Sequence, residues 1–569
     1  MNWYHTTRSS WNERSQGMTS PTGKAADGRI TPRYRPRQVE KRPPCQTDCP
    51  NCGDIRGWIG VIAQREKTGV SRAAAYQEAW GMITDVNPFP STLGRICPHP
   101  CEQHCNRGEF DEPMAINAME RFLGDWAIEH DLPLQRLESE AGDEWIGVIG
   151  AGPSGLSFAY QMARRGYRVT IYEGRDQPGG MLRFGVPEYR LPQACLDAEI
   201  GRIINLGVDL QLATQVGRDI SLEELRDRHA ALYLGLGAQS GRRLGIPGED
   251  GPSVFSGTDY LARVNCGEEI ELGKRVVVVG GGNSAIDAAR MARRSGAQVT
   301  VMYRRSRVEM PATTAEIEDA LEEGVELQLL TAPMRISRAD DGILTGIVAC
   351  RMQLGEPDES GRQKPLPLPD SEYHMDASAV ITAVSQAPAL AGFESLRHAG
   401  DWLLTDSVGR VADDILAGGD VLSLGIAGNA IVQGRNAAER LHARLRGLEE
   451  SEVASDGGPQ AGSERIDFEQ KTSSTPIKAV KLEGAERVAH GSAEVKGTVT
   501  EEQFLQEIER CYSCGSCMGC EQCAMFCTAG CFTKLTECGP GMYFSLTLDA
   551  CEGCGKCIEV CPCGYLEVS

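Results

Sequence analysis

The sequence contains no long hydrophobic run. Among its 569 residues, no stretch of about 18 or more apolar residues occurs, the length that a membrane-spanning helix needs. The opening residues, MNWYHTTRSSWNER, also lack the apolar core of a signal peptide. We therefore expect a cytoplasmic protein with no membrane span.

The chain has no surplus of positive charge either. Its formal net charge of −21 argues against a nucleic-acid groove, because neutralising phosphates requires clustered Lys and Arg. A content of 41% hydrophobic and 24% charged residues is that of a globular protein. At this length several domains are expected.

The middle of the chain is nearly free of cysteine. Of the 22 cysteines, only Cys195, Cys266 and Cys350 lie there, and the others crowd at the two ends in short spacings. In a protein expected in the cytoplasm, such spacing favours metal ligation over disulfides.

The pattern along the chain predicts a multidomain protein. Residues 1–40 are polar and indicate an arm, and amphipathic stretches such as SRAAAYQEAWGMIT predict a helical domain over 41–140. From 141 to 446, short Val-, Ile- and Leu-rich runs alternate with helical segments, which is typical of parallel α/β units. Residues 447–505 are polar and predict a linker, and 506–569 hold 13 of the 22 cysteines.

The α/β region contains an internal sequence repeat. WIGVIGAGPSG at 145–155 is matched by RVVVVGGGNSA at 275–285, which predicts two Rossmann-like dinucleotide-binding units. Each motif follows a strand and opens a helix, so its glycines allow a tight turn and a close approach of the backbone to a pyrophosphate. The expected loop residues are Gly150, Gly152, Pro153, Ser154 and Gly155 in the first unit, and Gly280, Gly282, Asn283, Ser284 and Ala285 in the second.

The two units differ where their second strands end. In the first, Glu173 stands where an acid accepts a hydrogen bond from a ribose hydroxyl. In the second, Arg304 and Arg305 can pair with a 2′-phosphate. NADPH is thus favoured over NADH, and a solvated basic turn is the alternative for one of the two arginines.

The first unit is expected to hold a flavin, because hydride chemistry needs an acceptor close to the nicotinamide. In the stretch AGGD, Gly419 and Asp420 suit contacts to a flavin ribityl chain and phosphate. Gln433 follows in a segment that can begin a helix toward the isoalloxazine.

The C-terminal cysteines have the doubled C-x2-C-x2-C-x3-C spacing of two-cluster bacterial ferredoxins, in which the fourth Cys of each run ligates the other cluster. The spacing predicts one [4Fe–4S] cluster on Cys517, Cys520, Cys523 and Cys561, and a second on Cys551, Cys554, Cys557 and Cys527. A zinc ribbon is the alternative. No role is predicted for Cys511, Cys514, Cys531, Cys538 or Cys563.

Residues 40 to 445 resemble the glutamate synthase small subunit family of iron–sulfur flavoproteins. GRICPHPCEQHC, MAINAMERF, PGGMLRFGVPEYRLP, YRRSRVEMPA and AGGDV stand in the family's order. The resemblance implies a helical iron–sulfur domain, an FAD domain over 141–265 and 396–446, and an NAD(P)H domain over 266–395 inserted into it. It also implies that Gly179, Gly180, Met181 and Arg190 contact FAD, and that Arg304 and Arg305 contact the 2′-phosphate.

The N-terminal cluster ligands are less regular. By position, Cys49, Cys97 and Cys101 match the family's cluster nearer the flavin, and Glu120 stands where some relatives supply a non-cysteine ligand. A helix-surface acid is the alternative for Glu120. The family's second cluster needs two further cysteines upstream of Cys45 that are absent here, so one N-terminal cluster is expected. Cys45 and Cys105 match the absent cluster, and either could replace Glu120 as a ligand.

Together these features predict an enzyme that exchanges hydride between NADP(H) or NAD(H) and FAD and passes single electrons through [4Fe–4S] clusters to or from a redox protein. The C-terminal region resembles the ferredoxin-like α+β domain of longer relatives. This resemblance implies a dissimilatory sulfite reductase, a ferredoxin or a 2-oxoacid oxidoreductase as the partner, and the sequence does not separate these. A glutamate synthase small subunit and a non-catalytic electron-transfer or scaffold subunit are the alternatives. No side-chain catalytic base is expected, and dimerisation stays open.

Overall fold

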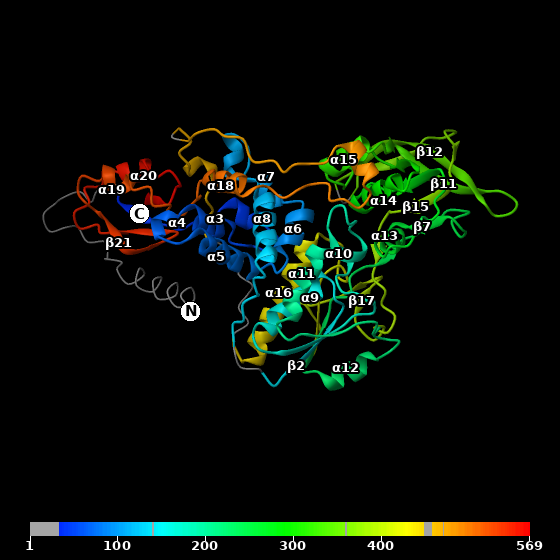
Figure 1. Cartoon of the computed structure of the whole chain (residues 1–569), viewed down its shortest axis with the longest axis horizontal. Coiled ribbons are helices and arrows are strands. Elements are labelled where there is room, and N and C mark those ends of the chain that lie inside the picture. Colours follow the sequence, from blue (N-terminus) through cyan, green and yellow to red (C-terminus); the bar gives the residue numbers. More distant parts are fainter. Residues whose placement is uncertain (1–33, 139–141, 359–360, 449–457, 470) are drawn as a thin grey trace.

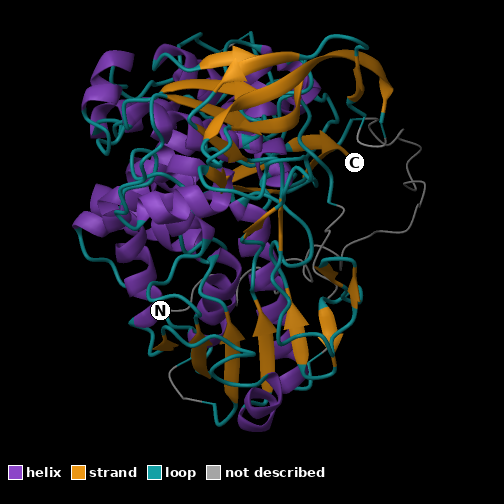
Figure 2. Cartoon of the chain, turned by 90° about the vertical axis from the view of Figure 1, so that its right-hand side faces the viewer, coloured by secondary structure: helices purple, strands orange, loops and turns teal. Residues whose placement is uncertain are grey.

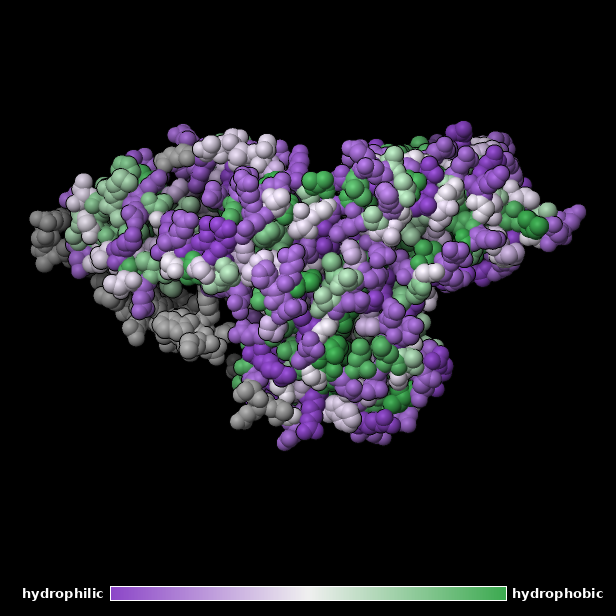
Figure 3. All heavy atoms as spheres, in the orientation of Figure 1, coloured by the Kyte–Doolittle hydropathy of each residue, from purple (hydrophilic) through white to green (hydrophobic). Residues whose placement is uncertain are grey.

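The computed structural model describes residues 34–138, 142–358, 361–448, 458–469 and 471–569. Figure 1 shows a central helical region, an α/β unit below it, a second α/β unit at the upper right and the C-terminal region at the upper left. Over the described residues, no helix is long and apolar enough to cross a membrane. Hydrophilic residues cover most of the face shown in Figure 3, and hydrophobic ones gather mainly on the lower unit.

The central region is built from α3 (Ile55–Ala63), α5 (Arg72–Thr84), α6 (Pro90–Ile96) and α8 (Ile116–Glu129). In α5, the Ser71 hydroxyl accepts from the Ala74 amide at 3.3 Å and caps the helix. Tyr76, Ala79, Trp80 and Ile83 are buried on one face of α5, the spacing of an amphipathic helix. The predicted helix is confirmed.

The lower unit contains a six-stranded sheet in the order β19-β20-β5-β2-β3-β4, seen at the bottom of Figure 2. Its centre is parallel: β2 (Trp145–Ile149) lies between β3 (Arg168–Tyr172) and β5 (Ala231–Leu234), and β5 pairs with β20 (Ile415–Ala417). β4 (Asp209–Gln211) and β19 (Arg410–Ala412) form its edges. Because β19 and β20 come from residues beyond 400, the chain leaves this sheet and returns to it.

The excursion forms the second unit, a parallel sheet in the order β10-β9-β8-β15-β7. β8 (Arg275–Val279) lies between β9 (Gln298–Met302) and β15 (Ala379–Thr382), as β2 lies between β3 and β5. The edge strands are β7 (Val254–Ser256) and β10 (Glu326–Gln328). An antiparallel sheet of β11 (Thr331–Arg338), β12 (Leu344–Pro357), β13 (Gln363–Pro367) and β14 (Tyr373–Asp376) extends the unit.

The C-terminal region contains α18 (Glu501–Glu509), α19 (Gln522–Phe526), the hairpin of β21 (Phe532–Gly539) and β22 (Met542–Leu546), and α20 (Lys556–Glu559). Its last strand, β23 (Leu566–Val568), pairs antiparallel with β1 (Pro36–Gln38). The expected arm over 1–40 therefore packs at its end, because β23 offers a free edge to residues 36–38. Residues 1–33 lie outside the described residues.

The second half of the expected linker is packed rather than free. The Arg487 guanidinium in α17 (Gly484–Ala489) lies 2.9 Å from Glu322 and 3.3 Å from Asp319, both on α15 (Thr314–Glu322). Farther along, Glu494 accepts from Arg95 of α6 at 2.8 Å. This segment thus ties the second α/β unit to the helical region.

Candidate functional site

A cavity of about 290 Å³ lies beyond the carboxyl ends of β2 and β3 in the lower unit. This edge is where parallel α/β sheets bind nucleotides. Nine of the residues predicted to contact FAD line this single cavity: Gly150, Gly152, Pro153, Ser154, Glu173, Gly180, Met181, Gly419 and Asp420.

The glycines of the first loop have distinct roles. Gly150 has a φ of +101°, which L side chains rarely adopt. A Cβ on Gly155 would lie 2.0 Å from the Gly150 carbonyl oxygen, so only glycine lets α9 (Pro153–Ala163) start this close to β2. A Cβ on Gly152 would meet nothing nearer than 3.9 Å, so its space faces the cavity. This open cradle beside a helix N-terminus fits a pyrophosphate.

Two carboxylates face the cavity. Glu173 accepts from the Ala151 amide at 2.8 Å and the Arg175 amide at 2.9 Å, which braces the loop and leaves acceptor capacity for a ribose hydroxyl. Asp420 accepts from the Gly425 amide at 3.1 Å, and burial raises its pKa to about 6. Both are placed to accept from hydroxyl groups of a bound dinucleotide.

Gln433 lies outside the cavity lining but supports it. From α16 (Ala427–Leu445), its side-chain oxygen accepts from the Gly419 amide at 2.6 Å and fixes the turn that carries Asp420. Gly179 likewise supports the loop, because its amide donates to the Ala151 carbonyl at 2.8 Å.

Sequence reasoning missed several polar residues of this cavity, among them Arg175 and Gln239. Arg175 Nε donates to Gln239 Oε1 at 3.3 Å. The Arg175 guanidinium also stacks 4.1 Å from the centre of the Phe184 ring. The available signals were the position of Arg175 just after Glu173 and of Gln239 at the end of AALYLGLGAQ.

Arg190 does not lie in the cavity lining, and the prediction that it contacts FAD needs correction. Its Nη1 lies 2.9 and 2.7 Å from the two carboxylate oxygens of Asp287, and its Nε lies 3.3 Å from Glu316. Asp287 is on α14 (Asn283–Arg294) of the second unit. Arg190 therefore joins the two α/β units.

The second glycine loop has the same geometry as the first. Gly280 has a φ of +151°, and a Cβ there would lie 2.3 Å from the Ala383 carbonyl oxygen. A Cβ on Gly282 would meet nothing within 4 Å, which leaves space for a phosphate at the start of α14. Asn283, Ser284 and Ala285 form the first turn of this helix, and Ala285 is buried where the first loop has Gly155.

The arginine pair separates into one exposed and one buried side chain. Arg305 is 4% exposed; its Nη2 lies 2.6 Å from Asp358 and its Nε donates to the Gln363 carbonyl at 2.7 Å. Arg304 is exposed at the end of β9. The geometry revises the prediction for the pair: Arg304 is available to a 2′-phosphate, and Arg305 holds the β12–β13 hairpin.

Cys49, Cys97, Cys101 and Glu120 form one group in the helical region. Glu120 is close enough to all three thiols to raise their pKa values, although burial is the larger cause. Burial also raises the pKa of Glu120 to about 7, and its Oε1 accepts from Asn87 at 2.8 Å. Next to Cys49, the Asn51 carbonyl accepts from Arg435 of α16 at 3.0 Å, so this group adjoins the lower α/β unit.

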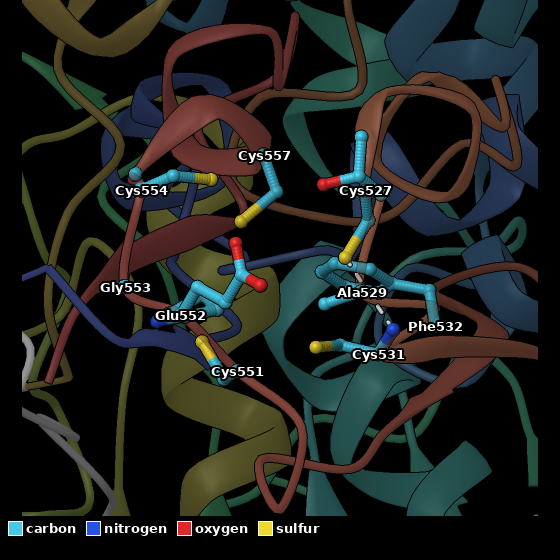
Figure 4. A pocket seen from close by; sticks show the side chains of 12 residues that line it. Cys527, Ala529, Cys531, Phe532, Cys551, Glu552, Gly553, Cys554 and Cys557 are labelled. Carbon is cyan, nitrogen blue, oxygen red and sulfur yellow. Dashed lines mark hydrogen bonds between the residues drawn. The ribbon is translucent and has the colours of Figure 1, made fainter.

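The ferredoxin-like cysteines gather in two cavities with the exchanged fourth ligand that the spacing predicts. Cys561 shares a cavity with Cys517, Cys520 and Cys523. Cys527 shares another with Cys551, Cys554 and Cys557, and Figure 4 shows these four sulfur atoms around one space. Cys563 lies in the cavity of Cys517, and Cys531 lies in the cavity of Cys551.

Cys45 and Cys105 do not join the Glu120 group. They line a separate cavity with Cys511 and Cys514, residues for which the sequence predicted no role.

Within the described parts of the chain, no three His, Cys, Asp or Glu side chains converge closely enough to hold a single metal ion.

Two family profiles match this chain. The profile of the pyridine nucleotide-disulphide oxidoreductases matches residues 145–439, from β2 into α16. The chain belongs to this family. A second profile, dihydropyrimidine dehydrogenase domain II with its 4Fe-4S cluster, matches residues 37–132.

Several relatives resemble this oxidoreductase over much of its length. It is 40% identical over 353 residues to the NADPH-Fe(3+) oxidoreductase subunit beta of Geobacter sulfurreducens, covering 61% of this chain and 51% of that protein. It is 35% identical over 507 residues to the NADP(+)-dependent formate dehydrogenase subunit beta of Moorella thermoacetica, covering 83% and 70%. It is 33% identical over 441 residues to the glutamate synthase [NADPH] small chain of Azospirillum brasilense, covering 72% and 88%. The match thus spans about half the length of the Geobacter subunit.

Among solved structures, FprA from Mycobacterium tuberculosis in complex with NADPH aligns with a TM-score of 0.48 and 20% identity, covering 53% of this chain and 85% of that one.

The cavities fit the cofactors that this family implies. The glycine cradle and the two carboxylates suit FAD, and the thiol groups in apolar surroundings suit [4Fe–4S] clusters. The chain is therefore an iron–sulfur flavoprotein of the oxidoreductase family.

Proposed function

We propose that this chain exchanges hydride between NADPH and FAD and passes the electrons singly through [4Fe–4S] clusters to or from a redox protein. The observation that carries the proposal is the presence, in one polypeptide, of two glycine cradles and of cysteine groups that begin beside the FAD unit. A bound flavin supplies the required conversion, because it exchanges two electrons with nicotinamide and one at a time with a cluster.

The protein's own groups bind and orient the nucleotides. The amides at the start of α9 and α14 would hold the two pyrophosphates, and Glu173 and Asp420, which line the cavity of the lower unit, would accept from hydroxyl groups of FAD. Arg304 pairs with the 2′-phosphate and favours NADPH over NADH. The Arg190–Asp287 pair fixes one nucleotide unit against the other.

The cysteine groups provide the one-electron path. We propose that Cys49, Cys97, Cys101 and Glu120 hold the cluster nearest FAD, and that the two ferredoxin-like groups hold the clusters farthest from it. The described cysteines are all free thiols, and closely spaced thiols persist in a reducing compartment, which supports the cytoplasm.

The partner is proposed to be another polypeptide. The Geobacter and Moorella relatives are named as beta subunits and the Azospirillum relative as a small chain. A ferredoxin, a sulfite reductase and a 2-oxoacid oxidoreductase are each consistent with a one-electron surface at the C-terminal region.

The test is an anaerobic titration of the purified chain with NADPH or NADH, followed by visible absorption, with iron and acid-labile sulfide measured on the same sample. Bleaching of the flavin by NADPH at a lower concentration than by NADH, with at least about twelve irons per chain for three clusters, supports the proposal. A fully loaded protein that neither nucleotide bleaches would overturn it. Gly152→Ala, whose Cβ would enter the open cradle, is expected to lose FAD, whereas Gly201→Ala, a substitution with nothing within 4 Å, keeps it.

A further inference from the structure

Four cysteines from opposite ends of the chain meet in one cavity. Cys45 lies on the short helix α2 (Pro44–Asp48) and Cys105 just before η1 (Asn106–Glu109), whereas Cys511 and Cys514 follow α18. The cavity between them measures about 30 Å³, against about 20 Å³ in each ferredoxin-like group. It is thus no smaller than either site predicted from spacing, and its four thiols are the number that one [4Fe–4S] cluster needs.

Buried arginines lock the two chain segments together at this point. Arg56 Nη1 donates to the Lys41 carbonyl at 2.5 Å and to the Cys514 carbonyl at 2.9 Å. Arg107 Nη1 donates to the Arg510 carbonyl at 2.5 Å. The backbone on both sides of the Cys511–Cys514 pair is therefore held by side chains of the N-terminal segment.

The surroundings suit a negatively charged thiolate cluster. Arg56 and Arg107 line the cavity, and among the described residues no Asp or Glu does. The remaining lining is mainly apolar, with Pro43, Pro44, Ile55, Ile59, Met114 and Ile116. The Ser513 amide donates to the Cys511 sulfur at 3.5 Å. Positive side chains and amide donors stabilise cluster sulfur.

Burial and neighbouring thiols of the group disfavour the ionisation of Cys45, Cys511 and Cys514. Burial raises the pKa of Cys514 to about 12 and that of Cys511 to about 11, and neighbouring thiols of the group add to both shifts. Burial and the same neighbours raise the pKa of Cys45. The same interactions show that these thiols lie close to one another and to Cys105.

We infer that Cys45, Cys105, Cys511 and Cys514 hold a fourth [4Fe–4S] cluster, shared between the N-terminal and C-terminal segments. The pair Cys511-x2-Cys514 supplies the two ligands that the sequence lacks upstream of Cys45. The inference rests on the proposed iron–sulfur chemistry but not on the nucleotide chemistry. It raises the expected total from three clusters to four.

The position of this cluster connects the other sites. Cys45 precedes Cys49 of the FAD-adjacent group by four residues, about 6 Å along a helix. Cys514 precedes Cys517 of the ferredoxin-like group by three residues, a span of at most about 10 Å. Each electron that enters from one neighbour leaves to the other, so the cluster returns to its starting oxidation state and no further reactant is needed.

The test compares metal content in the full chain purified without oxygen. The unmodified protein is expected to contain about sixteen irons and as many sulfides, and C511A/C514A about twelve. C105A is expected to lose the same four, and C105A/C511A/C514A no more than either, because all three cysteines serve one cluster. FAD content and the rate of flavin reduction by NADPH are recorded on each sample and are expected to stay near those of the unmodified protein.

The matched control is C538A, since Cys538 lies in β21 with its thiol donating to the Leu535 carbonyl and lines none of the cysteine cavities described above. It is expected to keep all iron. The shared cluster would be overturned by about twelve irons in the unmodified protein or by zinc in place of iron. It would also be overturned if the combined variant lost the sum of the irons that the separate variants lose. A protein that holds sixteen irons but is not reduced by NADPH would contradict the proposed function and leave the fourth cluster standing.

Discussion

Arg190 and Asp287 form a buried ion pair across the boundary between the two nucleotide-binding units. Their side chains are 12% and 5% exposed, and the Nη1–Oδ2 distance is 2.7 Å. Asp287 belongs to α14, whose first turn faces the second nucleotide site, whereas Arg190 follows the flavin-cavity residues Gly180 and Met181 in sequence. The pair therefore fixes the orientation of one α/β unit against the other.

Arg190→Gln is expected to lower the free energy of unfolding by about 3 kcal/mol, because it leaves a buried carboxylate without its partner. It is also expected to slow flavin reduction at saturating NADPH, because the two units lose their fixed orientation. Thermal unfolding and stopped-flow absorption measure the two effects. Arg218→Gln is the control: its pair with Asp219 is 62% and 39% exposed, and no change in Tm is expected. Equal Tm values for both variants would contradict the role of the pair.

Arg304→Gln is expected to raise the KM for NADPH by roughly tenfold to a hundredfold, the value of a charged hydrogen bond to phosphate. The KM for NADH should not change, because NADH has no 2′-phosphate. Arg305→Gln should lower Tm and leave the NADPH to NADH preference close to that of the unmodified protein, since its guanidinium is already bound to Asp358 and Gln363. Steady-state kinetics with both nucleotides decide between the arginines. A loss of preference in Arg305→Gln alone would reverse the assignment.

Gly282→Ala is expected to fold normally, because its Cβ would have nothing within 4 Å. The methyl group would instead occupy the approach of the NADPH pyrophosphate and raise the KM for NADPH about tenfold or more, equivalent to roughly 1.4 kcal/mol. FAD and iron content should be unchanged. In contrast, Gly155→Ala places a Cβ 2.0 Å from the Gly150 oxygen and should lose FAD. A Gly282→Ala enzyme with unchanged kinetics would argue against nucleotide binding at this loop.

The affinity for FAD should rise with pH through about 6. Burial raises the pKa of Asp420 from 3.8 to about 6 in the FAD-free protein. Hydroxyl donors of FAD favour the ionised carboxylate, so binding releases a proton near this pH and weakens as pH falls below it. Asp420→Asn should bind FAD more weakly and lose this dependence. Fluorescence titration of the FAD-free protein with FAD, from about pH 5 to about pH 8 so as to bracket this pKa, measures the affinity and its pH dependence. An identical pH profile in the variant would exclude Asp420 as the source.

Local patterns predicted which glycines and carboxylates gather around the cavity of the lower unit. Gly150, Gly152 and Gly155 lie within six residues of one another, and their spacing alone encodes the strand, turn and helix that shape the cradle. The doubled cysteine spacing likewise predicted which thiols share a cavity, because each ferredoxin-like loop wraps three ligands within seven residues. Arg190 was misjudged because nothing in its own segment indicates that Asp287, nearly a hundred residues later, neutralises it.

The sequence by itself determined the family, the two nucleotide loops and the two ferredoxin-like cysteine groups, since each depends on motifs of residues that lie close together in the chain. Only the tertiary structure decided which arginine is exposed at the second nucleotide site and which cysteines complete the site of Cys45 and Cys105. Arg305 is buried by the β12–β13 hairpin, and Cys511 and Cys514 reach Cys45 from more than 400 residues away. Such contacts depend on how whole domains pack against one another, and the spacing of residues along the chain does not predict them.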